Sequence, residues 1–321
     1  MEILKLKPAV NKAIWGGRRL VEEYGLKTHK KNSAEGWMLS CHKDGPCKVT
    51  NGKYKGKTLE EALNAEGKEV LGTNNAERSD FPILIKFIDA KDKLSIQVHP
   101  ADEYARRVEN ENGKTEAWLI LDAEEDAQLV YGVKREVLKE EFSDSIENNT
   151  VEEILNYVKV KKGDVVFIPS GMLHAIGKGI FLAEVQQNSN TTYRVYDYDR
   201  RDKNGKPREL HIKKATDVAN LSVAACDFSP KGKTEVLPNG AERTYLTGCE
   251  YFSMTEVKIN SSYNGSADSS SFVSILILDG EGRLSSGKQR FSVKKGNSFF
   301  VPAGKGKFIL EGNLSVLETR T

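Results

Sequence analysis

The sequence predicts a mainly β protein made of two barrel-like domains. Most of the chain consists of short runs rich in β-branched and aromatic residues, separated by turns that contain glycine, and this pattern favours a sandwich or barrel. A spacing of glycine and proline that begins at residue 163 recurs from residue 296. A length of 321 residues is also sufficient for two domains of about 150 residues each.

Each expected strand is a run of apolar and alternating residues that ends at a glycine, a proline or a polar turn. Helices are expected at 101–110, where Pro100 can occupy a first helical turn, and at 133–142 and 151–159. We expect the last two to form a small helical insertion at about 133–159. The expected strands are 82–90, 94–100, 116–123, 127–133, 164–169, 180–186, 191–199, 251–259, 272–280, 290–296, 298–304, 307–312 and 314–320.

The strand at 94–100 is the first part of a predicted metal site. Successive side chains of a strand point to opposite faces, so Gln97 and His99 share one face with Ser95, while Ile96 and Val98 can face a core together with Leu94. Two potential ligands therefore emerge side by side.

Two later segments supply further donors. The same alternation sends Lys114 and Glu116 to one side of the next strand. Further on, the glycine and proline positions between Gly163 and Gly171 indicate a strand, a tight turn and a second strand, which would return His174 over the first pair. We predict that these segments converge on one divalent metal ion.

The second copy of this turn begins at Gly296 and has Lys307 at the position that corresponds to His174. The turn is retained and the ligand is lost. We therefore expect residues 1–230 to form a metal-binding catalytic domain and residues 231–321 to form a second barrel without metal. The polar stretch 228–243 is the expected linker.

Charge and cysteine content exclude several classes of protein. The chain has 48 basic and 46 acidic residues, and its short basic runs do not indicate a nucleic-acid partner. Four cysteines without C-x-x-C spacing are expected to be reduced thiols, and Gly45-Pro46 between Cys41 and Cys47 indicates a turn rather than a metal site. No signal peptide or membrane-spanning run is recognisable, so we expect a cytoplasmic protein without membrane contact.

Taken together, these motifs resemble a known family. Gln97-Val98-His99 with Glu116, and the segment from Gly163 to His174, resemble the two motifs of the cupin superfamily. More narrowly, LSIQVHP, KTE, PSGMLHA and EVQQNSNTTYRVYDYDR resemble the short bacterial class of type I mannose-6-phosphate isomerases, as do the earlier AIWGG and SAEGWMLS. The resemblance implies two cupin-type jelly-roll β-barrels, with one zinc ion per chain held by Gln97, His99, Glu116 and His174.

The same resemblance implies a reaction and the residues that perform it. The reaction is the interconversion of mannose 6-phosphate and fructose 6-phosphate through an enediolate, so the expected partner is a small sugar phosphate. Arg194 is the expected cation facing the enediolate, and Glu184 and Lys114 are the expected groups in proton transfer, with their division of roles left open. Each of these residues could instead have a purely structural role; Lys114, for example, could be a surface lysine.

The phosphate contacts are also inferred from the resemblance. Arg200 is expected to bind the phosphate through a bidentate contact, and Ser95 to add a hydroxyl. The alternative for Arg200 is a surface ion-pair cluster with the neighbouring aspartates. Two departures are notable: Asn190 stands where many relatives have an aspartate proposed to assist ring opening, and Ile176 where longer relatives have a tyrosine.

Two other functions are compatible with a cupin barrel. One is a metal-dependent oxygenase, although such sites usually have histidine where Gln97 stands. The other is a sugar-binding cupin without catalysis, which would have little use for both a base and a cation around the metal. Nothing in the sequence predicts an oligomeric state.

Overall fold

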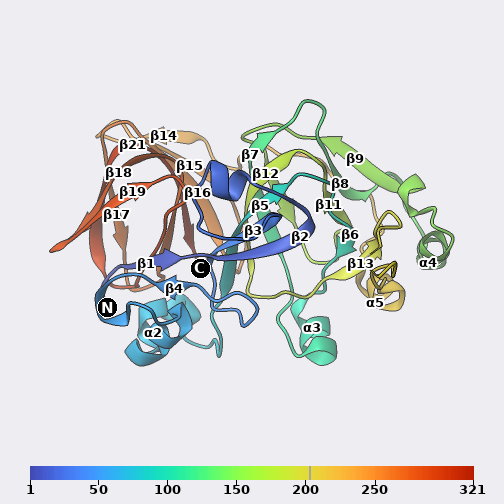
Figure 1. Ribbon diagram of the computed structural model, residues 1–321, viewed down its shortest axis with the longest axis horizontal. Coiled ribbons are helices and arrows are strands. Elements are labelled where there is room, and N and C mark those ends of the chain that lie inside the picture. Colours follow the sequence, from blue (N-terminus) through green and yellow to red (C-terminus); the bar gives the residue numbers. More distant parts are fainter. Residues whose placement is uncertain (202–203) are drawn as a thin grey trace.

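A computed structural model describes residues 1–201 and 204–321, and it confirms a mainly β protein. Two β-barrel-like halves stand side by side, with the carboxy-terminal half in orange and red and most of the amino-terminal half in green and yellow (Figure 1). No helix in the described ranges is long and apolar enough to cross a membrane.

Two facing sheets form the amino-terminal half. The six-stranded sheet has the order β10-β7-β12-β5-β2-β3, and the five-stranded sheet has the order β13-β6-β11-β8-β9. The strands of the first sheet are β2 (Ala9–Gly17), β3 (Ser33–Leu39), β5 (Ile83–Ala90), β7 (Glu116–Ala123), β10 (Val165–Ile168) and β12 (Ile180–Gln187). The strands of the second are β6 (Ile96–Val98), β8 (Gln128–Val133), β9 (Leu155–Lys159), β11 (His174–Ile176) and β13 (Tyr193–Tyr196).

The central strands β5 and β12 are buried along their whole length because both of their faces are covered. On one face Ile85, Phe87 and Val185 belong to the core cluster shared with the carboxy-terminal half. On the other face Ile88 and Leu182 pack inside the amino-terminal barrel. Charged side chains on this inner face are therefore held in a nearly water-free position.

The carboxy-terminal half contains a ten-stranded sheet that also includes two strands from the start of the chain. The expected strands 307–312 and 314–320 form one strand, since Gly312 and Asn313 keep their pairing with β18 across the gap. The strands are β1 (Leu4–Lys7), β4 (Lys48–Val49), β14 (Thr234–Val236), β15 (Glu242–Gly248), β16 (Ser253–Ile259), β17 (Ser262–Ala267), β18 (Val273–Ser286), β19 (Gln289–Lys294), β20 (Ser298–Val301) and β21 (Gly306–Arg320).

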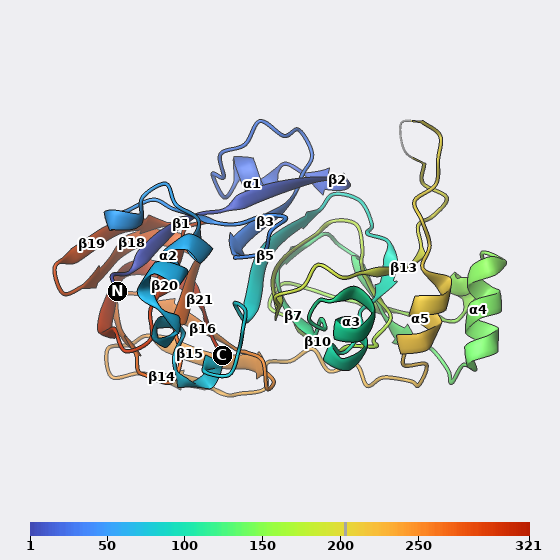
Figure 2. The same cartoon turned by 90° about the horizontal axis from the view of Figure 1, so that it is seen from below.

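β1 pairs with β20, with Leu4 opposite Phe300, and it pairs with β4 on its other side. The first strand of the chain therefore belongs to the sheet of the last residues (Figure 2). The domain boundary at residue 230 stays a prediction. β1 comes from the first predicted domain but lies in the sheet of the second. In the second copy of the repeated turn, Lys307 is exposed.

The helices are short and lie at the periphery. The expected helix after His99 is present as α3. The helix expected at 133–142 forms later in the chain, at Lys139–Glu147 (α4), because Val133 is the last residue of β8 and pairs with β9. The prediction of a helix at 151–159 is wrong: only one 3₁₀ turn forms there, followed by β9, which pairs with β8 because Leu155 and Val158 meet apolar partners on that strand. The helices are α1 (Arg19–Glu22), α2 (Leu59–Glu66), α3 (Asp102–Glu109), α4 (Lys139–Glu147), α5 (Ile212–Val218), and the 3₁₀ turns η1 (Gly52–Tyr54), η2 (Lys68–Leu71), η3 (Thr73–Asn75) and η4 (Val151–Glu153).

Two local features have clear sequence causes. Thr58 and Glu61 form a capping box at the start of α2, in which each side chain accepts the other's backbone N–H. The cysteines are all free, as expected, and the turn at Gly45 closes with a hydrogen bond from the Cys47 N–H to the Ser40 carbonyl.

Candidate metal centre and active site

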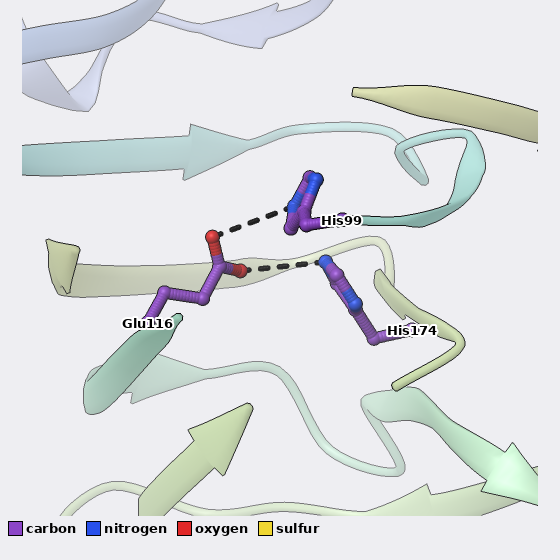
Figure 3. A group of neighbouring side chains, drawn as sticks. All are labelled: His99, Glu116 and His174. Atoms are coloured by element: carbon purple, nitrogen blue, oxygen red, sulfur yellow. Dashed lines mark ion pairs between the residues drawn. The ribbon is translucent and has the colours of Figure 1, made fainter. Parts of the chain in front are cut away.

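Three donor side chains from distant parts of the sequence meet between the two sheets (Figure 3). The Nε2 atom of His99 lies 3.5 Å from one oxygen of Glu116, and the Nε2 atom of His174 lies 3.3 Å from the other. The donor atoms are all within 4.8 Å of one another, and the three side chains are at most 1 % exposed. This is the convergence that the sequence predicted.

Strand register explains why these residues meet. His174 begins β11 directly opposite Gln97 of β6, while Glu116 begins β7 on the facing sheet. The turn before β11 requires Gly171 in a left-handed conformation with φ of 85°, which side chains rarely adopt. The Nδ1 atom of His174 lies 2.8 Å from the Met172 carbonyl oxygen, so this nitrogen carries the proton and Nε2 is left as a lone-pair donor.

Gln97 completes the predicted set of four. Its side-chain amide nitrogen lies 3.3 Å from Nε2 of His174, and rotation of the amide by half a turn would present the oxygen instead. The strand alternation predicted for this segment is confirmed for Ser95 and Gln97, which both line the cleft described below. Leu94 is buried in the core of the amino-terminal barrel, as expected, and it also borders the cleft. It does not share the core cluster of Ile96 and Val98, because the strand starts only at Ile96.

The electrostatics of the three donors fit a cation. Burial, reinforced by the negative charge of Glu184, raises the pKa of Glu116 to about 7. Burial lowers the pKa of His174 to about 4 and, together with the charge of Lys114, lowers the pKa of His99 well below its usual value. Both oxygens of Glu116 are buried; one forms an ion pair with Lys114, and the other faces Nε2 of His174. Two neutral imidazoles and a buried carboxylate are a donor set that suits a divalent ion such as zinc.

Lys114 supplies a positive charge to this group. Its ammonium lies 2.8 Å from Nε2 of His99 and 2.8 Å from an oxygen of Glu116, and its side chain is 5 % exposed. The interpretation of Lys114 as a surface lysine is therefore wrong. Lys114 also lines the cleft described below and therefore connects that cleft with the buried donors.

Glu184 lies beside the donors in a row of side chains that crosses the six-stranded sheet. It stands opposite Lys86 on β5 and opposite Trp118 on β7. One oxygen is 3.0 Å from the Lys86 ammonium, and the other accepts a hydrogen bond of 3.0 Å from the Trp118 indole N–H. Burial alone would raise the pKa of Glu184, but the charges of Lys86 and Lys114 outweigh burial and hold the pKa below its usual value. Glu184 is therefore ionised at neutral pH.

A cleft of about 490 Å³ opens over these groups. Its walls come from β2, from the inner faces of β5 and β12, and from the segment around β13. Asn190 lies in the wall and donates a hydrogen bond of 2.8 Å to Asp44, and Ile176 is buried beside it. The predicted site residues that line the cleft are Ser95, Gln97, Lys114, Glu184 and Arg194.

Arg194 is held on β13 opposite Gln97. One of its terminal nitrogens donates a hydrogen bond of 3.0 Å to the Glu209 carbonyl, while its buried Nε atom has no hydrogen-bond partner among the described residues. Its backbone N–H donates to Nδ1 of His211 at 3.0 Å. Arg194 is thus positioned as a fixed cation that faces the cleft.

Arg200 is placed differently from the other predicted residues. It does not line the cleft, and its guanidinium binds Asp197 and the carbonyl oxygen of Lys93. The phosphate contact predicted for Arg200 stays a prediction, and this position does not support it. Arg208, which the sequence analysis did not single out, lines the cleft instead.

Lys86 and Trp118, which bind the Glu184 carboxylate, were also not predicted as site residues from the sequence. A lysine in the middle of the apolar run ILIKFIDA is an unusual residue for a buried strand, so the sequence contained a signal for Lys86. Trp118 and Arg208 carried no such signal, because their roles depend on pairing with residues that lie far away in the sequence.

Two facing sheets that enclose two histidines and a glutamate beside an open cleft define a cupin-fold protein with a metal-binding type of site. Comparisons with known proteins agree. Residues 3–117 match the profile of the phosphomannose isomerase type I catalytic domain, and residues 241–320 match the mannose-6-phosphate isomerase cupin domain. The mannose-6-phosphate isomerase ManA of Bacillus subtilis is 42% identical over 313 residues, which cover 97% of this chain and 96% of the relative.

A second relative, the mannose-6-phosphate isomerase of Streptococcus mutans, is 37% identical over 100% of this chain and 98% of its own. A crystal structure of the mannose 6-phosphate isomerase from Bacillus subtilis superposes with a TM-score of 0.90 at 38% identity, covering 99% of each chain. The chain belongs to the type I mannose-6-phosphate isomerase family and is an enzyme of that class, as its motifs predicted.

Proposed function

We propose that the cleft interconverts mannose 6-phosphate and fructose 6-phosphate through an enediolate, with one zinc ion held by Gln97, His99, Glu116 and His174. The observation that carries this proposal is the meeting of three buried donors, within 4.8 Å of one another, in contact with Lys114, which also lines a cleft that contains Glu184 and several cations. A purely sugar-binding protein would not need this combination.

Zinc is supported by the chemistry of the donors and by one solved structure. Two imidazoles with oxygen donors suit zinc, and a neutral amide donor preserves more positive charge on the metal than another anionic ligand would. The zinc-bound form of a mannose 6-phosphate isomerase has the same fold, with a TM-score of 0.77 at 18% identity. When bound, the ion would act as a Lewis acid and polarise the sugar oxygens.

The remaining steps belong to residues of the chain. The isomerisation moves a proton between the second and first sugar carbons. Glu184 is ionised, buried and oriented by Lys86 and Trp118, which supports its role as the base. Arg194 lines the cleft, and its backbone and the Glu209 carbonyl fix its position, so its positive charge would stabilise the negative charge of the enediolate. Lys114 lines the cleft and contacts the donors, so it would hold a proton near the sugar oxygens, or return one to them, while the carbon-bound proton moves.

The site of action is proposed to be the cytoplasm. Four free cysteines support a reducing compartment, and the substrate is a small sugar phosphate.

The test is a coupled assay for fructose 6-phosphate with and without a chelator, combined with metal analysis of the His99→Ala variant. We expect the chelator to abolish turnover, zinc to restore it, and His99→Ala to lose metal content and turnover together. His29→Ala is the matched control, because His29 is exposed and lies outside the donor group. Full activity of the His99→Ala variant would remove the metal from the proposal.

A further inference from the structure

The buried carboxylate of Asp197 joins two arginines at the base of a hairpin beside the cleft. Asp197 is 5 % exposed and directly follows β13. It accepts a hydrogen bond of 2.6 Å from Nε of Arg208 and one of 3.1 Å from Nε of Arg200. Further out, Arg201 forms a bridge with Pro207, and the described arms on either side of this bridge stand out from the body of the protein (Figure 2). Asp197 therefore fixes both sides of the hairpin at its base.

The two arginines use their nitrogens differently. All three nitrogens of the Arg200 guanidinium donate within the protein, to Asp197 and to the Lys93 carbonyl oxygen. Arg208 donates to Asp197 through Nε and Nη2, while its Nη1 donates to nothing within the described ranges. Arg208 is also the one of the two that lines the cleft. Arg200 thus anchors the hairpin, and Arg208 keeps a donor for a ligand.

The residues after Arg208 connect it to the catalytic cation. The backbone carbonyl of Glu209 accepts from the Arg194 side chain at 3.0 Å, and the His211 N–H donates to the Arg194 carbonyl at 2.8 Å. Both arginines line the cleft, and burial, followed by the positive charge of Arg208, lowers the pKa of Arg194. One end of the cleft therefore holds a fixed pair of arginines.

The charge of this end suits a dianion. Three arginines and one aspartate give a net charge of +2 for the group Arg194, Arg200, Arg208 and Asp197. Elsewhere in the cleft, Lys86 is paired with Glu184 and Lys114 with Glu116, so those cations are already balanced. A phosphate monoester carries a charge of about −1.5 to −2 at neutral pH and accepts several hydrogen bonds.

We propose that Asp197 is a positioning residue for the phosphate of the substrate, because it fixes Arg208 at the rim of the cleft, where Nη1 binds the phosphate oxygens. This inference deepens the proposed function and rests on it. Asp197 itself would not touch the substrate, since its carboxylate would repel a phosphate and is fully used by the two arginines.

The test measures steady-state kinetics with mannose 6-phosphate and, independently of turnover, the binding of inorganic phosphate by calorimetry. We expect Arg208→Gln to raise both KM and the phosphate Kd by about 10- to 100-fold, as expected for the loss of a charge-assisted hydrogen bond, with kcat within about twofold. Asp197→Asn should shift both quantities in the same direction, and Arg208→Lys should recover part of the loss because it keeps the charge without the planar fork.

Two further variants separate this role from general electrostatics. Arg201→Gln removes a positive charge from the same hairpin without touching Asp197, since the Arg201 side chain donates to the Gly205 carbonyl, and it should change neither quantity. Lys12→Gln removes the cleft cation on β2 and should leave phosphate binding unchanged. Equal effects of Arg201→Gln and Arg208→Gln would overturn the proposal in favour of long-range attraction.

The remaining outcomes are also decisive. A large effect of Lys12→Gln with an unchanged Arg208→Gln variant would overturn the proposal by placing the phosphate at β2. Absence of isomerase activity in the unmodified enzyme would instead refute the proposed function, while the calorimetric comparison would still decide the role of Arg208. If Asp197→Asn does not fold, as judged by thermal unfolding, Arg208→Gln and Arg208→Lys carry the test.

Discussion

Replacing Lys86 by methionine should destabilise the fold more than the loss of an ordinary ion pair. The ammonium of Lys86 lies 3.0 Å from Glu184, and the two side chains are only 5 % and 3 % exposed. Removing one partner of a buried pair leaves an uncompensated charge and typically costs about 3–5 kcal/mol. We therefore expect Lys86→Met to lower the free energy of unfolding by about this amount at pH 8.

The free energy of unfolding lost in Lys86→Met should depend on pH, and the direction of this dependence follows from the pKa of Glu184. In the native enzyme the pKa of Glu184 is below its unfolded value, so its stabilising contribution is present above the unfolded pKa and is lost as the pH falls through the folded pKa. In Lys86→Met the main attraction is gone and burial raises the folded pKa. The variant then tolerates a protonated Glu184, and its loss relative to the unmodified enzyme should be smaller at pH 5 than at pH 8.

The measurement is urea denaturation at both pH values, followed by tryptophan fluorescence in the presence of a chelator, so that metal binding does not contribute. Trp37, whose ring lies 5.3 Å from the Lys86 ammonium, is a suitable reporter. Lys159→Met is the control, because its pair with Asp126 is 68% and 71% exposed, so solvent screens it and its loss should change stability far less than the loss of Lys86. A loss below about 1 kcal/mol for Lys86→Met, or an equal loss at both pH values, would refute the reasoning.

Two other predictions concern the base and a helix start. Glu184→Gln should lower kcat by about a hundredfold to ten-thousandfold while zinc content, measured by mass spectrometry, stays that of the unmodified enzyme; a kcat within twofold would shift the base to Lys114. Thr58→Ala removes the acceptor for the Glu61 N–H at 3.1 Å and should lower the free energy of unfolding by about 1 kcal/mol in denaturant titration, with kcat unchanged. Thr234→Ala loses only an exposed hydroxyl contact with Thr244 and should have a clearly smaller effect.

The donors could be predicted from the sequence because local rules place them. Alternation along a strand assigned Gln97 to the cleft side, and a glycine turn returned His174 over it. The same rules failed at 151–159, where the pattern of apolar residues suits a helix but the available partner is the edge of β8. Tertiary pairing decided between two locally acceptable structures there.

The groups around the donors could not be predicted in the same way. Lys86 and Glu184 come together because β5 and β12 pair in one particular register, and a shift of β12 by one residue would move Glu184 to the opposite face and separate the pair. Arg208 lines the cleft and keeps an unused nitrogen, whereas Arg200 does neither, and this difference depends on how both arginines are placed around Asp197. Such assignments need the three-dimensional arrangement.

The pairing of β1 with β20 limits how the molecule can be divided. β20 lies between β18 and β1, so a fragment of residues 231–321 would leave one of its sides without hydrogen-bond partners. An apolar strand that contains Phe299 and Phe300 would then be open to neighbouring copies and would promote aggregation. During synthesis, β1 likewise cannot form its pairing with β20 until the last third of the chain has been made. Excising either barrel therefore demands a replacement for the missing strand.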